Sequence, residues 1–295
     1  AAAGRLLGLD AEGIQSAFGI ALSQSAGSMQ FLADGAWTKR SHVGQAASNG
    51  LLCATFAAEG FRGPAEAFEG NWGFLRSYAP HAEPEKAVKA LGEKWETLEL
   101  AVKPYPSCRY THAPMDGLVA LRNEQALDPD AIESVEVGVS ATGHKLIGEP
   151  QHLKTHPVSI VDGQFSMPFC AAVVLRHGNL LWDDYPVQLK DQETLALCRK
   201  VNTVVDERAE ATFPDRMSGV VTVKTGQGSF ETFVGLPKGE PGNFMSEDEF
   251  RAKFSGLCEP YLEENRLEQL ADALLQLDGA ANVTEVFSLS RPQAG

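Results

Sequence analysis

The chain has 295 residues, enough for one large or two ordinary domains, and its 43% hydrophobic and 22% charged residues are typical of a folded protein with a sizeable core. With 25 lysines and arginines against 39 aspartates and glutamates, its formal net charge is −14, which argues against nucleic acid as a partner because phosphates would be repelled over most of the surface. A small anion can still bind where lysines, arginines and helix ends gather locally.

The cysteines and the polar residues of the charge-free stretches indicate where the protein works. Its five cysteines are widely spaced and form no C-x-x-C pair, so we expect reduced thiols and a cytoplasmic location. Glutamine, serine and asparagine interrupt the charge-free stretches 13–33 and 41–58, so we expect neither to span a membrane. Residues 1–8 have the pattern of a helix tail closed by glycine, without an initiator methionine, so we expect a further segment upstream.

Helical patterns fill the first hundred residues. Asp10 is an expected N-cap for a helix that Gly27 ends. A second helix is expected from about 41 to 59; alanine and glycine dominate its faces, so we expect neighbouring helices to cover it and little of it to meet water. Shorter helices are expected at 64–68 and 84–91.

The pattern changes after residue 95 and becomes mixed. Residues 132–139 alternate as a half-buried strand does, while the apolar run 169–175 fits either a helix or a strand. We expect strands at 98–102, 220–225 and 230–234, the last two as a hairpin, and helices at 113–123 and 191–200.

Helical signals return near the C-terminus. Ser246 with Glu249 three residues later is a capping box, a second amphipathic helix is expected at 267–277, and the last residues resemble a tail. The fold class is therefore α+β. We expect a helical domain over 1–97, an α+β domain over 98–245 and C-terminal helices over 246–295.

The first candidate site lies at the start of the second helix. Lys39, Arg40 and His42 precede or begin it, and the free N–H groups of a helix start favour a carboxylate or phosphate, which two cations would also attract. A neutral His42 could act as a base there. The alternative is that the two cations are solvated at a loop end and that His42 is a capping residue.

A second basic cluster comes just before the helix at 113–123. Two prolines stiffen a loop that carries Lys103, Ser107, Cys108, Arg109 and His112. The alternative is an ordinary strand-to-helix connection. Two basic, histidine-bearing helix starts in one chain would together form a receptor for a substrate with two or three carboxylates.

Other patterns are weaker. His152 and His156 have the spacing of a zinc pair, but a proline follows and no glutamate lies between them. Cys108 with His112 could suggest a thiol nucleophile, yet both lie on one short segment and no orienting third residue is evident. Residues 226–228 lack the third glycine of a dinucleotide site, and Ser166 is more typical of a helix cap.

Several motifs in this order resemble the MmgE/PrpD family, which includes 2-methylcitrate dehydratases, cis-aconitate decarboxylases and iminodisuccinate epimerases. The resemblance covers nearly the whole chain. The matching stretches are residues 39–44 with 50–51, 60–64 with 70–74, 103–109 with His112, 165–168, and 237–241.

The resemblance implies an all-helical domain completed by the C-terminal helices, an α+β lid, and an active site between them. It implies a homodimer that needs no metal or organic cofactor, with Lys39, His42, Lys103 and residues 107–112 facing the cleft. One family variant has histidine where this chain has Cys108, which leaves the reaction open. The family also has an additional N-terminal helical segment with a further active-site histidine.

The leading hypothesis is a cofactor-independent lyase that dehydrates a 2-methylcitrate-like acid. Decarboxylation or epimerisation by the same residues remains an alternative, as does a non-catalytic remnant or partner subunit. Dehydration needs a base beside a carboxylate, cations that hold the negative charge, and an acid for the departing hydroxyl. We assign Lys39, His42, Lys103 and His112 to catalysis and Arg40, Ser107, Cys108 and Arg109 to substrate binding.

Overall fold

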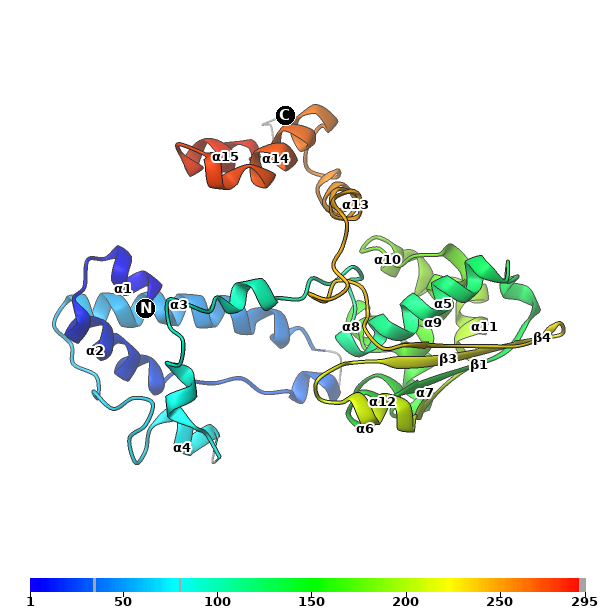
Figure 1. Cartoon of the computed structure of the whole chain (residues 1–295), viewed down its shortest axis with the longest axis horizontal. Helices are drawn as coiled ribbons and strands as arrows, with labels where there is room; N and C mark the ends of the chain where they lie inside the picture. Colours follow the sequence, from blue (N-terminus) through cyan, green and yellow to red (C-terminus); the bar gives the residue numbers. More distant parts are fainter. Residues whose placement is uncertain (34–35, 80, 292–295) are drawn as a thin grey trace. The chain divides into compact units, whose positions relative to one another are not determined.

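The computed structural model in Figure 1 describes residues 1–33, 36–79 and 81–291. The chain divides into two compact units, Ala1–Trp95 and a second that begins at Glu96. Every strand among the described residues belongs to the second unit. The mixture of helices and one four-stranded sheet agrees with the predicted α+β class.

The first unit opens with two short helices, α1 (Ala2–Leu6) and α2 (Ala11–Leu22). The Asp10 side chain accepts a hydrogen bond from the Gly13 backbone N–H at 2.9 Å, so the predicted N-cap is confirmed. The helix ends at Leu22, before the predicted glycine stop. A Cβ on Gly19 would overlap the Pro64 backbone, so glycine lets that loop pack directly on α2.

Helix α3 (Thr38–Ala58) begins three residues earlier than predicted and is far more exposed. Cys53 and Ala54 are its only buried residues in the part of the chain that the structure describes. The expectation that little of it meets water is wrong for the described residues, because most of α3 is exposed although α1 and α2 pack on it. The small residues therefore line an open surface of this unit.

The rest of the first unit departs from its predicted helices. Residues 64–66 have no regular structure and a turn begins at residue 67, so no helix forms over 64–68, and a 3₁₀ turn (Pro84–Ala87) replaces the helix expected over 84–91. Helix α4 (Phe74–Tyr78) lies where none was predicted. Segments of one or two turns gain too few hydrogen bonds to form on propensity alone, so packing against the rest of the fold decides whether they form.

The sheet of the second unit has the order β2-β1-β3-β4. Strand β1 (Ile132–Val139) has the predicted bounds and runs parallel to β2 (Val201–Val205), a strand that the sequence patterns did not predict. Strands β3 (Gly219–Thr225) and β4 (Gly228–Val234) form the predicted hairpin. No strand forms at 98–102, where a 3₁₀ turn (Glu96–Glu99) precedes irregular backbone.

Helices α5 (His112–Glu124) and α9 (Met167–His177) pack on this sheet and on each other, as Figure 1 shows. A Cβ on Gly117 would lie only 2.9 Å from Val221 Cγ2, so α5 approaches the sheet closely. The apolar run at 169–175 is part of α9, whose residues 167–175 are all buried. Helix α11 (Gln192–Cys198) packs against α9.

The C-terminal helices are α13 (Glu247–Cys258), α14 (Glu264–Leu275) and α15 (Val283–Leu289). The predicted capping box at the start of α13 is confirmed, whereas α15 replaces the predicted tail. That these helices complete the first unit stays a prediction.

The remaining helices of the second unit are α6 (Ala141–Gly143), a π-helical turn (His144–Gly148), α7 (Gln151–Lys154), α8 (Ile160–Gln164), α10 (Asp184–Gln188) and α12 (Glu207–Thr212).

None of the described helices combines the length and the apolar character that a membrane crossing requires.

Candidate functional site

Hydrogen bonds hold the Lys103 loop in one conformation. The Lys103 ammonium donates to the Ser107 carbonyl at 2.9 Å, which curls the loop back on itself. The Pro106 carbonyl accepts two bonds, from Gln164 Nε2 at 2.9 Å and from the Tyr185 hydroxyl at 3.0 Å. Pro106 has no N–H to donate, and its carbonyl is bonded to residues of α8 and α10. Two other segments of the second unit therefore anchor the loop. That the two prolines make this loop stiff stays a prediction.

Ser107 and Cys108 turn into the interior of the second unit. Both side chains are buried, and Ser107 Oγ lies 2.7 Å from Thr111 Oγ1. The Thr111 hydroxyl also donates to the Cys108 carbonyl at 2.7 Å. These bonds close the turn (Arg109–Thr111) that leads into α5. Their role in substrate binding stays a prediction.

The Arg109 guanidinium is bonded to protein groups. Its Nε donates to Glu240 Oε1 at 3.1 Å, and Nη2 pairs with the same oxygen. Its Nη1 donates to the Lys238 carbonyl at 3.4 Å and lies 3.0 Å from His112 Nδ1. Arg109 thus joins the loop to residues 238–240, and its role in substrate binding stays a prediction.

His112 is fully buried at the start of α5. Because a guanidinium only donates, we assign His112 Nδ1 as the acceptor and place the ring proton on Nε2. That Nε2 atom has no hydrogen-bond partner among the described residues. Burial, reinforced by the charges of Arg109 and Lys103, lowers the pKa of His112 to about 3. The imidazole is therefore neutral near pH 7.

A cavity of about 510 Å³ opens beside Lys103 within the second unit. Its lining carries three lysines, one glutamate and an apolar wall. The lining residues are Lys103, Pro104, Tyr105, Pro106, Gly178, Asn179, Leu181, Trp182, Lys238, Met245, Glu249, Ala252, Lys253, Gly256 and Leu257.

The first unit has its own cavity, of about 800 Å³, with His42 in its wall. Gln45 and Asn49 of α3 line it too, together with Tyr78 of α4. The His42 ring packs edge-to-face with Phe31, with 6.3 Å between their centroids. This imidazole beside amide side chains is suited to binding a polar ligand.

Lys39 and Arg40 lie on the first turn of α3, since the helix starts at Thr38. Both are exposed, and the Arg40 guanidinium lies 5.5 Å from the centre of the Trp37 ring. Cations on a first turn are not favoured by the helix dipole. Lys39 and His42 belong to the first unit and Lys103 and His112 to the second, so a shared cleft stays a prediction.

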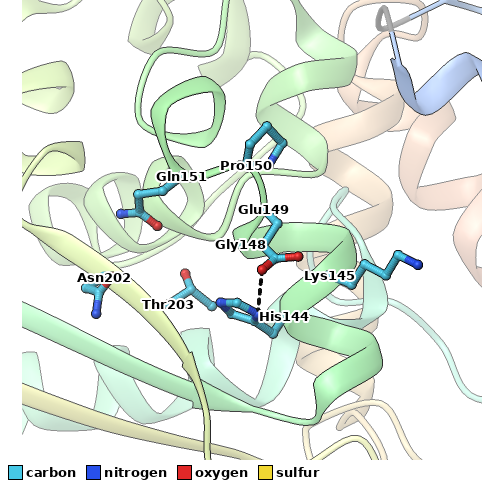
Figure 2. A pocket seen from close by; sticks show the side chains of 8 residues that line it. All are labelled: His144, Lys145, Gly148, Glu149, Pro150, Gln151, Asn202 and Thr203. Carbon is cyan, nitrogen blue, oxygen red and sulfur yellow. Dashed lines mark ion pairs between the residues drawn. The ribbon is translucent and has the colours of Figure 1, made fainter.

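A third cavity, of about 560 Å³, lies at the π-helical turn. Figure 2 shows the His144 ring turned toward Glu149, with His144 Nδ1 3.5 Å from Glu149 Oε1. Asn202 and Thr203 of β2 also line this third cavity. No motif in the sequence pointed to this pair or to the other residues of this wall.

The weaker patterns have structural explanations. His156 Nδ1 lies 2.9 Å from the Thr155 hydroxyl and 3.2 Å from the His152 carbonyl. Residues 1–33, 36–79 and 81–291 contain no group of three side chains placed to hold a metal ion. Ser166 accepts a bond from the Phe169 N–H at 3.0 Å, which makes it the cap of α9.

Four residues that shape the Lys103 cavity were not predicted as site residues. Asp116 and Lys253 carry no local signal in the sequence. Asp116 accepts hydrogen bonds from Tyr105 and from the Lys238 backbone N–H, and Lys253 donates to the Lys103 carbonyl, so both depend on distant segments. Lys238 and Glu240 lie in the matching stretch 237–241, so the motif pointed to them without indicating a role.

Family models match both units. The MmgE/PrpD N-terminal domain matches residues 1–87, and the MmgE/PrpD C-terminal domain matches residues 105–277. The chain is 28% identical to the cis-aconitate decarboxylase-like protein oryM of Aspergillus oryzae over 305 residues, which cover 98% of this chain and 62% of that protein. It is also 28% identical to a cis-aconitate decarboxylase of Aspergillus terreus over 310 residues, which cover 98% of this chain and 61% of that protein.

The chain therefore spans about three fifths of the length of these curated relatives. The two domain matches together cover most of its residues and follow the order of the motifs noted in the sequence. On this basis the chain belongs to the MmgE/PrpD family.

Proposed function

We propose that this chain is a lyase for a small substrate with two or three carboxylate groups, and that it decarboxylates a tricarboxylate such as cis-aconitate. The observation that carries the proposal is the Lys103 cavity, whose three lysines against one glutamate give it an excess of positive charge. This local excess stands out in a chain of net charge −14. The names of the relatives favour decarboxylation over the 2-methylcitrate dehydration favoured by the sequence hypothesis.

Loss of CO₂ breaks one carbon–carbon bond and leaves its electron pair on the carbon skeleton. A neighbouring carboxylate conjugated with that carbon takes up the negative charge, and a proton then adds to carbon. Cations near this carboxylate lower the barrier because they bind the charge as it develops. We assign this role to Lys103, whose ammonium also carries a proton to deliver.

Arg109 and His112 would act indirectly, by holding the cavity wall near Lys103 in place. Arg109 holds residues 238–240, and the neutral His112 accepts from Arg109, so both fix the cavity's wall. The role of Lys39, Arg40 and His42 toward the same substrate is a further part of the proposal. The proposal predicts that Lys39→Ala and Lys103→Ala each lower the turnover rate.

The test is turnover of cis-aconitate by the full chain, with the product followed by proton NMR. We expect CO₂ release and an unsaturated five-carbon dicarboxylate, and at least about a hundredfold slower turnover in Lys103→Met. Lys224→Met is the matched control, because Lys224 is an exposed residue of β3. Unchanged turnover in Lys103→Met would refute the site. Turnover of 2-methylcitrate alone would instead support dehydration.

The predicted homodimer and cytoplasmic location stay predictions. Sedimentation equilibrium of the purified chain tests the first, and a dimer mass is the expected result.

A further inference from the structure

Helix α13 presents one face to the Lys103 cavity. The residues of α13 that line it are Glu249, Ala252, Lys253, Gly256 and Leu257, a spacing that repeats on one side of a helix. A Cβ on Gly256 would meet no atom within 4 Å, so this face leaves open space in front of it. Helix α13 thus forms a wall of the cavity and carries charged groups into it.

The two charged residues of this wall differ in their partners. Glu249 pairs with the Lys238 ammonium and accepts the Ser246 backbone N–H at 2.8 Å, so it neutralises Lys238 and caps the helix. Lys253 donates to the Lys103 backbone carbonyl at 2.8 Å. A carbonyl takes one of the three ammonium donors and leaves the positive charge uncompensated.

Within residues 1–33, 36–79 and 81–291 no carboxylate pairs with the Lys253 ammonium, which is held in place by the Lys103 carbonyl. Burial lowers its pKa, as expected for a cation partly removed from water. The bond to the Lys103 carbonyl fixes it at the segment that carries the proposed catalytic lysine. A bound carboxylate would compensate its charge and replace the water it has lost.

The rest of the cavity suits a small carbon skeleton. Trp182, Leu181 and Met245 supply apolar surface, and Asn179 adds an amide. A volume of about 510 Å³ lies within the range of small-molecule sites. Lys103 and Lys253 approach this space from two different segments, so each is suited to a different carboxylate of one ligand.

We propose that Lys253 is a specificity-determining residue, which binds a carboxylate that a tricarboxylate substrate has and a dicarboxylate lacks. This inference rests on the proposed function, because it concerns the same cavity. It assigns to the C-terminal helices a direct contact with substrate.

The experiment measures binding of two unreactive probes to the full chain by titration calorimetry at fixed ionic strength. Tricarballylate has three carboxylates, and glutarate has the same five-carbon backbone without the central one. We expect Lys253→Met to weaken tricarballylate binding about tenfold and glutarate binding less than about twofold. Lys253→Arg should stay within about threefold of the wild type for both probes, because the charge remains.

Controls separate charge from structure. Lys224→Met removes an exposed lysine of β3 and should change neither affinity. Circular dichroism melting of Lys253→Met checks that the variant keeps the helix content and stability of the wild type. Equal weakening of both probes, or none, would overturn the role of Lys253.

The outcomes also distinguish this inference from the proposed function. Wild-type chain that binds tricarballylate and decarboxylates cis-aconitate, with Lys253→Met unaffected, leaves the function standing and removes this inference. Discrimination by Lys253 without turnover of any tricarboxylate supports the inference and removes the reaction. A wild-type chain that binds neither probe removes this inference, and one that also turns over no tricarboxylate removes the proposed function as well.

Discussion

The Tyr105 hydroxyl donates a 2.8 Å hydrogen bond to the carboxylate of Asp116 on α5. The second oxygen of Asp116 accepts the backbone N–H of Lys238 at 2.7 Å, across 122 positions of sequence. One carboxylate therefore joins two walls of the Lys103 cavity. Burial raises the pKa of Asp116, while the hydrogen bonds from Tyr105 and Lys238 favour its ionised form.

Replacing Asp116 with alanine should destabilise the second unit by about 2 kcal/mol, since it leaves the enclosed Tyr105 hydroxyl and Lys238 N–H without their acceptor. Urea unfolding followed by circular dichroism measures this loss. Tyr105→Phe, which removes one of the two bonds, should cost about 1 kcal/mol. Asp130→Ala, at an exposed position, is the control and should change stability by less than about 0.5 kcal/mol. Equal stability of Asp116→Ala and Asp130→Ala would contradict the joining role of Asp116.

His112 should make stability depend on pH. Its pKa is about 3 in the folded chain and near 6.5 when unfolded, so below pH 6.5 the unfolded state binds a proton that the folded state does not. Stability is therefore full above pH 6.5 and falls as the pH drops toward 3. The loss approaches about 1.4 kcal/mol per pH unit once the pH is well below 6.5.

His112→Gln provides the comparison, because glutamine offers an acceptor to Arg109 but does not titrate. The difference in unfolding free energy between the wild type and this variant should shrink from pH 7.5 to pH 5. A constant difference over that range would show that His112 is not held neutral.

Gly239 should tolerate no side chain. Its φ is +88°, and a Cβ there would overlap the Val102 carbonyl oxygen. Gly239→Ala should therefore lower stability by about 2 kcal/mol or more and weaken ligand binding, because residues 237–241 must move away from the Lys103 loop.

Gly256→Ala is the opposite case within the same unit. Gly256 lies inside α13 with open space around its Cα, so alanine should raise stability by up to about 1 kcal/mol. Differential scanning calorimetry of both variants checks the pair, and similar shifts in Tm would show that the backbone around the two glycines is equally tolerant.

The thiols should react in two classes. Cys258 is partly exposed, whereas Cys53, Cys108, Cys170 and Cys198 are buried. Because burial raises the pKa of Cys170 and removes it from solvent, its thiolate is scarce and inaccessible. One thiol should react rapidly with Ellman's reagent in native buffer and five in denaturant. Rapid labelling that persists in Cys258→Ser would be inconsistent with this structure.

Sequence patterns predicted the elements whose signals are local. The alternation in β1 and the capping box of α13 are both present, since each needs only neighbouring residues. The strand expected at 98–102 shows the limit. Val102 makes a backbone bond to Gly239 at 2.8 Å, and no described strand pairs with the segment. A strand requires a partner, and an alternating pattern does not supply one.

The sequence pointed to some residues of the candidate site and missed others, because it shows only local signals. Lys103 stood out through its prolines and its charge, and it lines a cavity. Arg109 carried the same signal, yet its guanidinium is bonded to Glu240 and His112. Whether a basic residue faces a ligand or an internal partner depends on segments far away in sequence, which local spacing does not reveal.

The walls of the Lys103 cavity come from residues 103–106, 178–182 and 238–257, whereas the last strand of the sheet ends at Val234. During synthesis the complete sheet can leave the ribosome before the final wall exists. A chain that ended just after β4 would contain all four strands and would lack the cavity wall formed by residues 238–257. The proposed carboxylate contact of Lys253 therefore belongs to a segment that is translated after the whole sheet.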